Sequence, residues 1–253
     1  MDNLRKRIKT VFEAILDAII PRKCAGCGKE REIFCALCRM TSYSKWFSCV
    51  LCGARNQSGA FCAQSCRRKT PKALKKAIWA GTYDNELKEA IWQLKYKKRK
   101  ELAKPLGMLL AKKLKSCCYS RDPISGNSQR WDLMENSIII PVPLHLIKEH
   151  ERGFNQARLI AEALGKEMNM PVVLNILKRI KNMAPQARAL NKKTRTENMV
   201  GIFSSDTVAL QPYCNATIIL VDDVATTGAT LFDAACALEE AGAIYIIGAL
   251  VAH

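Results

Sequence analysis

Two adjacent carboxylates, Asp222 and Asp223, follow an apolar, β-branched run at residues 217–221. Such carboxylates can accept hydrogen bonds from vicinal hydroxyl groups or hold the water shell of Mg²⁺. The short loop that follows precedes a helix-like stretch, where free backbone N–H groups, threonine hydroxyls and the helix dipole favour a phosphate. The loop residues with this role are Ala225, Thr226, Thr227, Gly228, Ala229 and Thr230. A phosphate beside a diol is a ribose 5-phosphate, and the run predicts a site for one.

Most of the twelve cysteines fall in closely spaced pairs within one N-terminal window. They are Cys24, Cys27, Cys35, Cys38, Cys49, Cys52, Cys62 and Cys66. Paired thiols at this spacing are typical of zinc sites, whereas a disulfide framework needs an oxidising compartment, and we find no signal peptide. We therefore expect two structural ZnCys4 sites. Sequential pairing of the clusters is the more economical arrangement, and a crossed pairing stays open.

The net charge of +17 is unevenly distributed, because the excess of Lys and Arg lies entirely within the first 115 residues. This asymmetry favours a polyanionic partner, although a solvated basic face is the alternative. The densest cluster mixes cations with aromatic rings, as single-strand binders do. It consists of Trp92, Lys95, Tyr96, Lys97, Lys98, Arg99 and Lys100. A helix C-terminus that favours cations, with Trp92 in the core, would give the same pattern.

The elements that must position these residues alternate between strands and helices, which predicts an α/β fold with a parallel sheet and right-handed crossovers. The expected strands are 78–83, 138–143, 172–177, 217–221 and 244–251, and the expected helices are 87–94, 102–114, 155–168 and 230–241. Residues 22–70 lack apolar periodicity, so metal binding must supply much of their folding free energy. The expected domains are an amphipathic helix at 1–21, a double zinc ribbon at 22–70, a basic helical hood or connector at 73–115, and the sheet domain at 136–253.

The N-terminal stretch shows apolar residues at helical spacing, with basic residues at its start. Packing against the rest of the protein is the first interpretation, and an interfacial membrane helix is the alternative. No apolar run reaches the roughly 20 residues of a membrane span. We therefore expect a cytoplasmic protein without an integral membrane segment, with peripheral contact at the inner face of the membrane left open.

The order of the motifs resembles the ComF family over nearly the whole chain. After the cysteine pairs come Leu-Lys-Tyr at 94–96, Pro-Val-Pro-Leu-His at 141–145, Arg-Gly-Phe-Asn-Gln-Ala at 152–157 and the carboxylate loop at 218–231. The resemblance implies a type I phosphoribosyltransferase-like sheet with helices on both faces and an N-terminal zinc ribbon. It also implies phosphoribosyl pyrophosphate (PRPP) with Mg²⁺ as ligand, and single-stranded DNA and DNA-uptake proteins as partners in natural transformation.

The same resemblance assigns the site residues. Asp222 and Asp223 become ribose-hydroxyl ligands with a catalytic role, the loop after them holds the 5′-phosphate, and Arg152 is the cation of a pyrophosphate loop at 143–154. A charge-matched lid at 181–198 would carry Arg195 as a further catalytic cation. Two other functions remain open: an active phosphoribosyltransferase on an unknown base, and a PRPP-sensing adaptor without catalysis.

Overall fold

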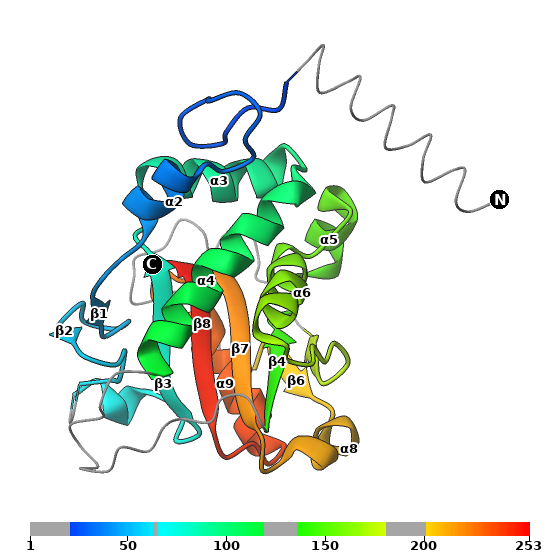
Figure 1. The fold of residues 1–253 in the computed structure, drawn as a ribbon. Helices are drawn as coiled ribbons and strands as arrows, with labels where there is room; N and C mark the ends of the chain where they lie inside the picture. The colour runs from blue at the N-terminus through cyan, green and yellow to red at the C-terminus, as the bar shows by residue number, and fades with distance from the viewer. Residues whose placement is uncertain (1–20, 63–64, 119–135, 181–200) are drawn as a thin grey trace, which may run out of the picture.

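A four-stranded parallel sheet lies at the centre of the computed structural model, which describes residues 21–62, 65–118, 136–180 and 201–253 (Figure 1). The strand order is β3-β8-β7-β4, and every neighbouring pair is parallel. The strands are β3 Leu74–Gly81, β4 Ser137–Pro141, β7 Thr217–Val224 and β8 Ile246–Ala252. Residues of these strands are buried almost throughout, as expected of a parallel sheet covered on both faces.

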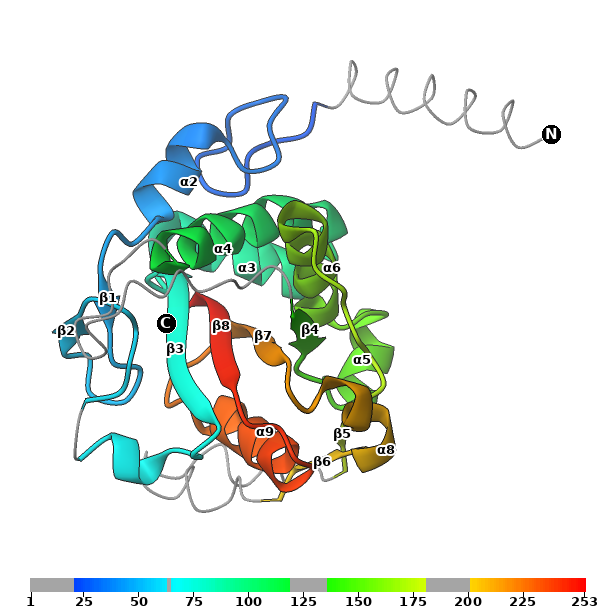
Figure 2. The ribbon, with the colours of Figure 1, turned by 60° about the horizontal axis from the view of Figure 1, so that its bottom comes forward.

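Helices cover both faces of the sheet, as the resemblance to the ComF family implied (Figure 2). One face carries α4 Ala103–Cys118 and α6 Gln156–Met168, and the other carries α9 Ala229–Glu240. A further helix, α3 Asn85–Tyr96, lies at the carboxyl edge of the sheet (Figure 1). Because successive side chains of a strand point to opposite faces, β7 contributes to two cores. Ile219 and Val221 join the core under α4 and α6, whereas Ile218 and Leu220 join the core under α9.

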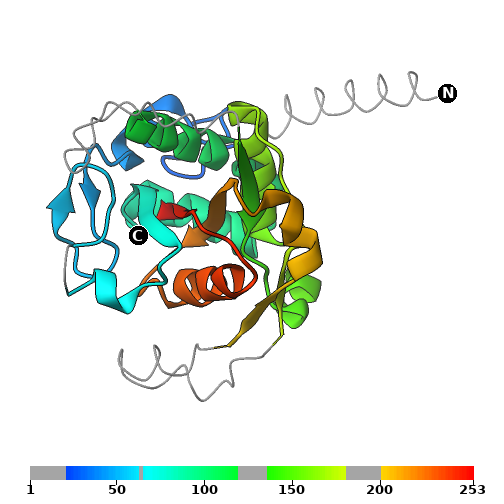
Figure 3. The same cartoon turned by 90° about the horizontal axis from the view of Figure 1, so that it is seen from below.

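Shorter elements surround the sheet. They are α2 Ala36–Ser42, β1 Phe47–Ser48, β2 Arg55–Asn56, η1 Arg67–Lys69, η2 Lys100–Leu102, α5 Leu146–Arg152, β5 Leu177–Arg179, β6 Phe203–Ser205, α8 Thr207–Leu210 and η4 Gln211–Tyr213. The antiparallel pair of β1 and β2 lies beside β3 at the edge of the sheet (Figure 3). α3 crosses above the carboxyl ends of the strands, and α2 packs on its outer side (Figure 1).

Residues 73–115 are part of the sheet domain rather than only a connector. Their first strand, β3, begins four residues before the expected position 78 and pairs with β8 along its length. Two lysines near its start, Lys75 and Lys76, obscure the apolar pattern. The expected strand at 172–177 is also corrected: Val172 makes one isolated bridge to Ile139, and the chain then leaves the sheet to pair β5 with β6.

Two predicted features lie outside the described residues: most of the N-terminal helix, and the lid that would carry Arg195. Within the part of the chain that the structure describes, no helix is long and apolar enough to cross a membrane.

A buried lysine joins α4 to the segment between α2 and β1. The side chain of Lys113 is almost fully buried, and its Nζ donates to the carbonyls of Ser44 and Trp46 at 2.8 Å each. It also lies 3.7 Å from the ring centroid of Phe47. Burial lowers the pKa of Lys113 to about 8, so the ammonium group is still mostly protonated at neutral pH. This contact fixes the cysteine-rich region against the sheet domain.

We predict that Lys113→Met lowers the free energy of unfolding by about 1–3 kcal/mol, because two carbonyl groups lose a charged donor. The matched control is Lys112→Met, since Lys112 is exposed on the same helix. It should change stability by less than about 0.5 kcal/mol. Chemical denaturation of the metal-saturated proteins measures both. Equal stabilities of the two variants would show that the buried lysine does not join the two parts.

Candidate phosphosugar site and metal centres

Both carboxylates of the predicted site lie inside β7 rather than beyond it. The strand continues through Val224, since β8 runs alongside it and pairs with Asp222 through Leu250. Side chains alternate along a strand, so Asp222 and Asp223 point to opposite faces of the sheet. Each buried carboxylate therefore meets a different set of neighbours.

Asp223 faces α3 and forms an ion pair with Lys95. Their side chains are only 6% and 16% exposed. Burial by itself lowers the pKa of Lys95, but the charge of Asp223 and its hydrogen bond outweigh that effect, and the pKa is raised. Lys95 is therefore a cation of the carboxylate site. From the sequence we grouped Lys95 with the basic residues of the DNA-binding cluster. In the structure its side chain is largely buried instead.

Asp222 faces the side of α9 and β5. Burial, and then the charge of Asp223, raise the pKa of Asp222 well above its usual range, although the backbone N–H of Asp223 donates to it at 2.8 Å. Arg179, the last residue of β5, carries a charge that interacts with Asp222. A buried carboxylate with a raised pKa favours a ligand that donates hydrogen bonds or brings a cation.

The loop after β7 turns sharply into α9 through a glycine. Gly228, the N-cap of α9, adopts φ 73°, and a Cβ there would lie 2.9 Å from the Phe232 ring. Thr227 accepts a hydrogen bond from the N–H of Ala229 at 3.4 Å, while Thr226 is exposed. The first turn of α9 thus opens at the same edge of the sheet as the two carboxylates.

Arg152 lies at the opposite side of this edge, in a segment that we expected to be a loop. The structure forms the short helix α5 there, and Arg152 is its last residue, followed by Gly153 with φ 78°. Its Nη1 donates to Gln156 of α6 at 2.8 Å, and its guanidinium lies 5.3 Å from the ring centroid of Tyr96. Arg152 therefore connects the N-terminus of α6 to the end of α3.

The end of α3 carries an exposed group of aromatic rings and cations. Trp92 and Tyr96 are 39% and 59% exposed, and their ring centroids are 5.9 Å apart. The ammonium group of Lys97 lies 5.4 Å from the Trp92 ring. Trp92 is thus a surface residue and not a core residue. Arg99 instead binds Glu101 and Gln93 at 2.8 and 2.6 Å, so its role is structural.

The N-terminal cysteines form two separate four-thiol groups. Cys24, Cys27, Cys35 and Cys38 form one, and Cys49, Cys52, Cys62 and Cys66 the other, with all sulfur atoms of a group within 4.8 Å of one another. The structure thus gathers them sequentially and not in the crossed arrangement. All cysteines whose side chains are described are free thiols.

Distances within the first group agree with a tetrahedral ion. A Zn–S bond of about 2.3 Å gives sulfur atoms about 3.8 Å apart. The Sγ atoms of Cys24 and Cys38 are 3.8 Å apart, and those of Cys27 and Cys35 are 3.7 Å apart. The backbone N–H of Cys35 donates to the Cys24 sulfur at 3.3 Å, which stabilises a thiolate. Each group can therefore hold a zinc ion.

Comparison with known proteins agrees with this geometry. Competence protein F of Haemophilus influenzae is 30% identical over 219 residues, which cover 87% of this chain and 85% of that protein. The chain belongs to the ComF family. Competence protein ComFC of Bacillus subtilis is 28% identical over 76% of this chain and 72% of its own length. DNA utilization protein YhgH of Salmonella typhimurium is 27% identical over 83% of this chain and 92% of its own length. No family model matches the chain.

Two polar residues near the site of this ComF-family chain, Asp233 and Arg179, were not predicted from the sequence. Asp233 of α9 accepts the backbone N–H groups of Gly201, Ile202 and Phe203 at 2.6, 2.8 and 3.1 Å, and so fixes the start of β6. Arg179 interacts with the charges of both Asp222 and Asp233. Neither residue belongs to a recognisable motif, so only the fold brings them to the site. The predicted cation Arg195 lies outside the described residues.

We predict about two zinc ions per chain, one in each four-thiol group. Cys27→Ser and Cys52→Ser each remove one exposed thiolate ligand, so each variant should bind about one zinc fewer. The matched control, Cys214→Ser, changes a thiol outside both groups and should retain both ions. Elemental analysis measures the metal content, and hydrogen exchange should show that a chelator unfolds only residues 22–70. Intact disulfides in mass spectra would contradict the prediction.

Proposed function

We propose that the carboxyl edge of the sheet binds PRPP with Mg²⁺. The observation that carries the proposal is that two buried adjacent carboxylates and the glycine-initiated N-terminus of α9 meet at one edge of a parallel sheet. In this arrangement the loop at 225–230 holds the 5′-phosphate, and Asp222 and Asp223 accept hydrogen bonds from the ribose hydroxyls. Arg152 supplies a cation for the pyrophosphate at the N-terminus of α6.

Lys95 has a defined part in this proposal. Its ammonium group forms an ion pair with Asp223 before any ligand arrives and offsets part of the cost of burying that carboxylate. An ionised carboxylate is a stronger hydrogen-bond acceptor for a hydroxyl than a protonated one. Lys95 is therefore a positioning residue for the ribose ligand. Bound Mg²⁺ would neutralise pyrophosphate charge and favour its departure as a leaving group.

The second part of the proposed function is the handling of DNA. Two relatives are named competence proteins, and a third is named a DNA utilization protein. We propose that this chain likewise acts in DNA uptake and natural transformation, by binding single-stranded DNA. The exposed end of α3 supports this, because Trp92 and Tyr96 can stack on bases while Lys97, Lys98 and Lys100 contact phosphates. DNA-uptake proteins are the proposed partners.

A phosphoribosyltransferase acting on a planar base is the second candidate function. The observation in its favour is that Tyr96 lies against Arg152, so an aromatic ring borders the proposed pyrophosphate position. Release of labelled pyrophosphate from PRPP in the presence of candidate bases would support an enzyme. Tight PRPP binding without such release would instead support a sensing role.

We predict that Asp222→Asn combined with Asp223→Asn weakens PRPP binding about a hundredfold or more, since hydrogen bonds to charged groups contribute about 1.5–3 kcal/mol each. Circular dichroism should show that the sheet still folds, although Asp223→Asn leaves the buried Lys95 without its ion-pair partner and lowers the stability. The control is Asp206→Asn, where an amide can still cap α8. Calorimetric titration with PRPP and Mg²⁺ measures both. Unchanged PRPP affinity in the double variant would contradict the proposal that these carboxylates bind PRPP.

We also predict that Trp92→Ala weakens binding of oligothymidylate by about 1–3 kcal/mol, through loss of base stacking. Thermal stability should stay almost constant, because the ring is partly exposed. Trp46→Ala is the matched control, as Trp46 is 63% exposed in the segment between α2 and β1. Fluorescence anisotropy and thermal denaturation give the two readouts. If Trp92→Ala unfolds the chain or leaves the affinity unchanged, the stacking role is wrong.

A further inference from the structure

The outer face of α4 carries a row of cations that the proposed function does not use. Among the side chains described for residues 103–117, the exposed ones are Lys104, Met108, Lys112, Lys115 and Ser116. The first four follow spacings of four, four and three residues, so they share one face of the helix. None of the exposed residues of this face is acidic. The face is therefore a straight cationic row, interrupted by one methionine.

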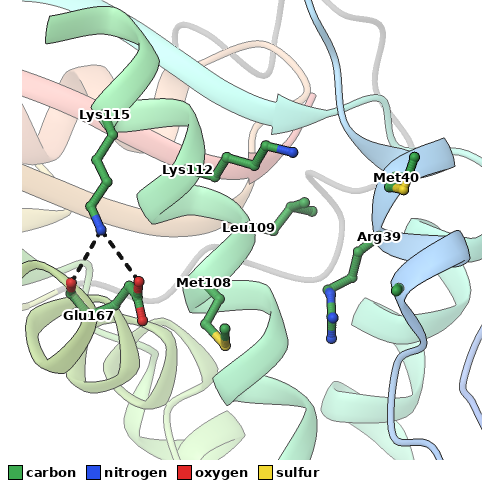
Figure 4. A pocket seen from close by; sticks show the side chains of 8 residues that line it. Arg39, Met40, Met108, Leu109, Lys112, Lys115 and Glu167 are labelled. Atoms are coloured by element: carbon green, nitrogen blue, oxygen red, sulfur yellow. Dashed lines mark hydrogen bonds and ion pairs between the residues drawn. The ribbon is translucent and has the colours of Figure 1, made fainter.

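A groove runs between this face and α2 of the first cysteine-rich group. Its volume is about 450 Å³, and the side chains lining it include Arg39, Met40, Met108, Lys112 and Lys115. Figure 4 shows Lys112 extending from α4 toward α2, while Lys115 turns toward Glu167 of α6. Met40 and Met108 are 69% and 39% exposed, so their thioether groups are accessible. The groove thus combines apolar contact surface with cations.

Several of these cations are held in place without being neutralised. The Arg39 guanidinium donates to the carbonyl of Phe34 at 2.9 Å, and Lys112 lies 4.6 Å from the ring centroid of Tyr43. Neither of these two contacts involves a carboxylate. The acidic residue that lines the groove, Glu167, is engaged by Lys115 at 3.3 Å. The groove therefore retains a net positive charge.

The dimensions favour an extended polyanion. Lys104 and Lys115 are eleven positions apart, which corresponds to about 16 Å along a helix at 1.5 Å per residue. An acidic amphipathic helix would need a continuous apolar strip. Leu109, which lies between Met40 and Met108, is only 4% exposed, and three cations line the same groove (Figure 4). A single-stranded nucleic acid needs cations spaced along its phosphates and apolar contacts for its bases that do not depend on sequence. The polarizable side chains of the methionines can supply those contacts.

The row is also continuous with the surface already proposed for DNA. Lys97, Lys98 and Lys100 are exposed where α3 ends, and α4 begins three residues after Lys100. We infer that single-stranded nucleic acid continues from the end of α3 along the outer face of α4 into the groove beside α2. This inference rests on the nucleic-acid half of the proposed function, and it adds a second contact surface bordered by the metal-binding region.

The test compares two variants of the full, zinc-loaded chain that lose equal charge. One carries Lys104→Gln, Lys112→Gln and Lys115→Gln, and the other carries Lys72→Gln, Lys166→Gln and Lys178→Gln, which are exposed lysines outside α4. Anisotropy with labelled oligothymidylate, over a range of salt concentrations, gives the affinity and its salt dependence. Loss of three phosphate contacts should reduce the magnitude of the log–log salt slope by about 2. The control variant should keep the wild-type slope.

Equal affinities and slopes for the two variants would overturn the inference while leaving the α3 contacts and the proposed function intact. The same holds if the α4 variant loses affinity for polyglutamate but not for oligothymidylate, since the row would then belong to an acidic protein. Absence of any oligothymidylate binding by the wild-type chain would overturn the nucleic-acid role itself. Calorimetric titration with PRPP on the same samples reports the sheet site separately, because none of the exchanged lysines lies there.

Discussion

Two carboxyl groups buried side by side on one strand impose the main constraint on this fold. The carboxylates of Asp222 and Asp223 repel each other and are shielded from water, so each requires a cation on its own face of the sheet. Lys95 of α3 meets this need on one face, and Arg179 of β5 approaches on the other. The path of α3 across the carboxyl ends of the strands therefore has an electrostatic reason as well as a packing one.

The sequence was most informative where function and local backbone shape depend on the same residues. The run from Ile218 to Thr230 predicted a strand, a loop and a helix, and the structure confirms these three elements. Cysteine spacing predicted the two four-thiol groups for the same reason, since a chelating turn is local. Periodicity also identified α3, α4, α6 and α9, because each buries one apolar face.

Contacts between residues that are distant in the sequence could not be predicted from local patterns. Lys95 sits in a run of cations, and its pairing with Asp223 appears only once α3 is placed over β7. Arg179 and Asp233 belong to no local pattern. The lysines of β3 hid the first residues of that strand, which was expected to begin at position 78, although Lys76 reaches the Cys117 sulfur at 3.3 Å. In each case a charged side chain, which usually indicates solvent exposure, is used inside the fold.

The position of β3 has a consequence for biosynthesis. This edge strand follows directly on the cysteine-rich region, but its partner β8 comes after β4 and β7 in the sequence. A ribosome therefore delivers the metal-binding segment long before the sheet can be completed. During that interval the backbone groups of β3 that later pair with β8 lack that partner, as in an exposed edge strand. Early metal capture and late sheet closure would make the pairing of β3 wait for the synthesis of residues 246–252.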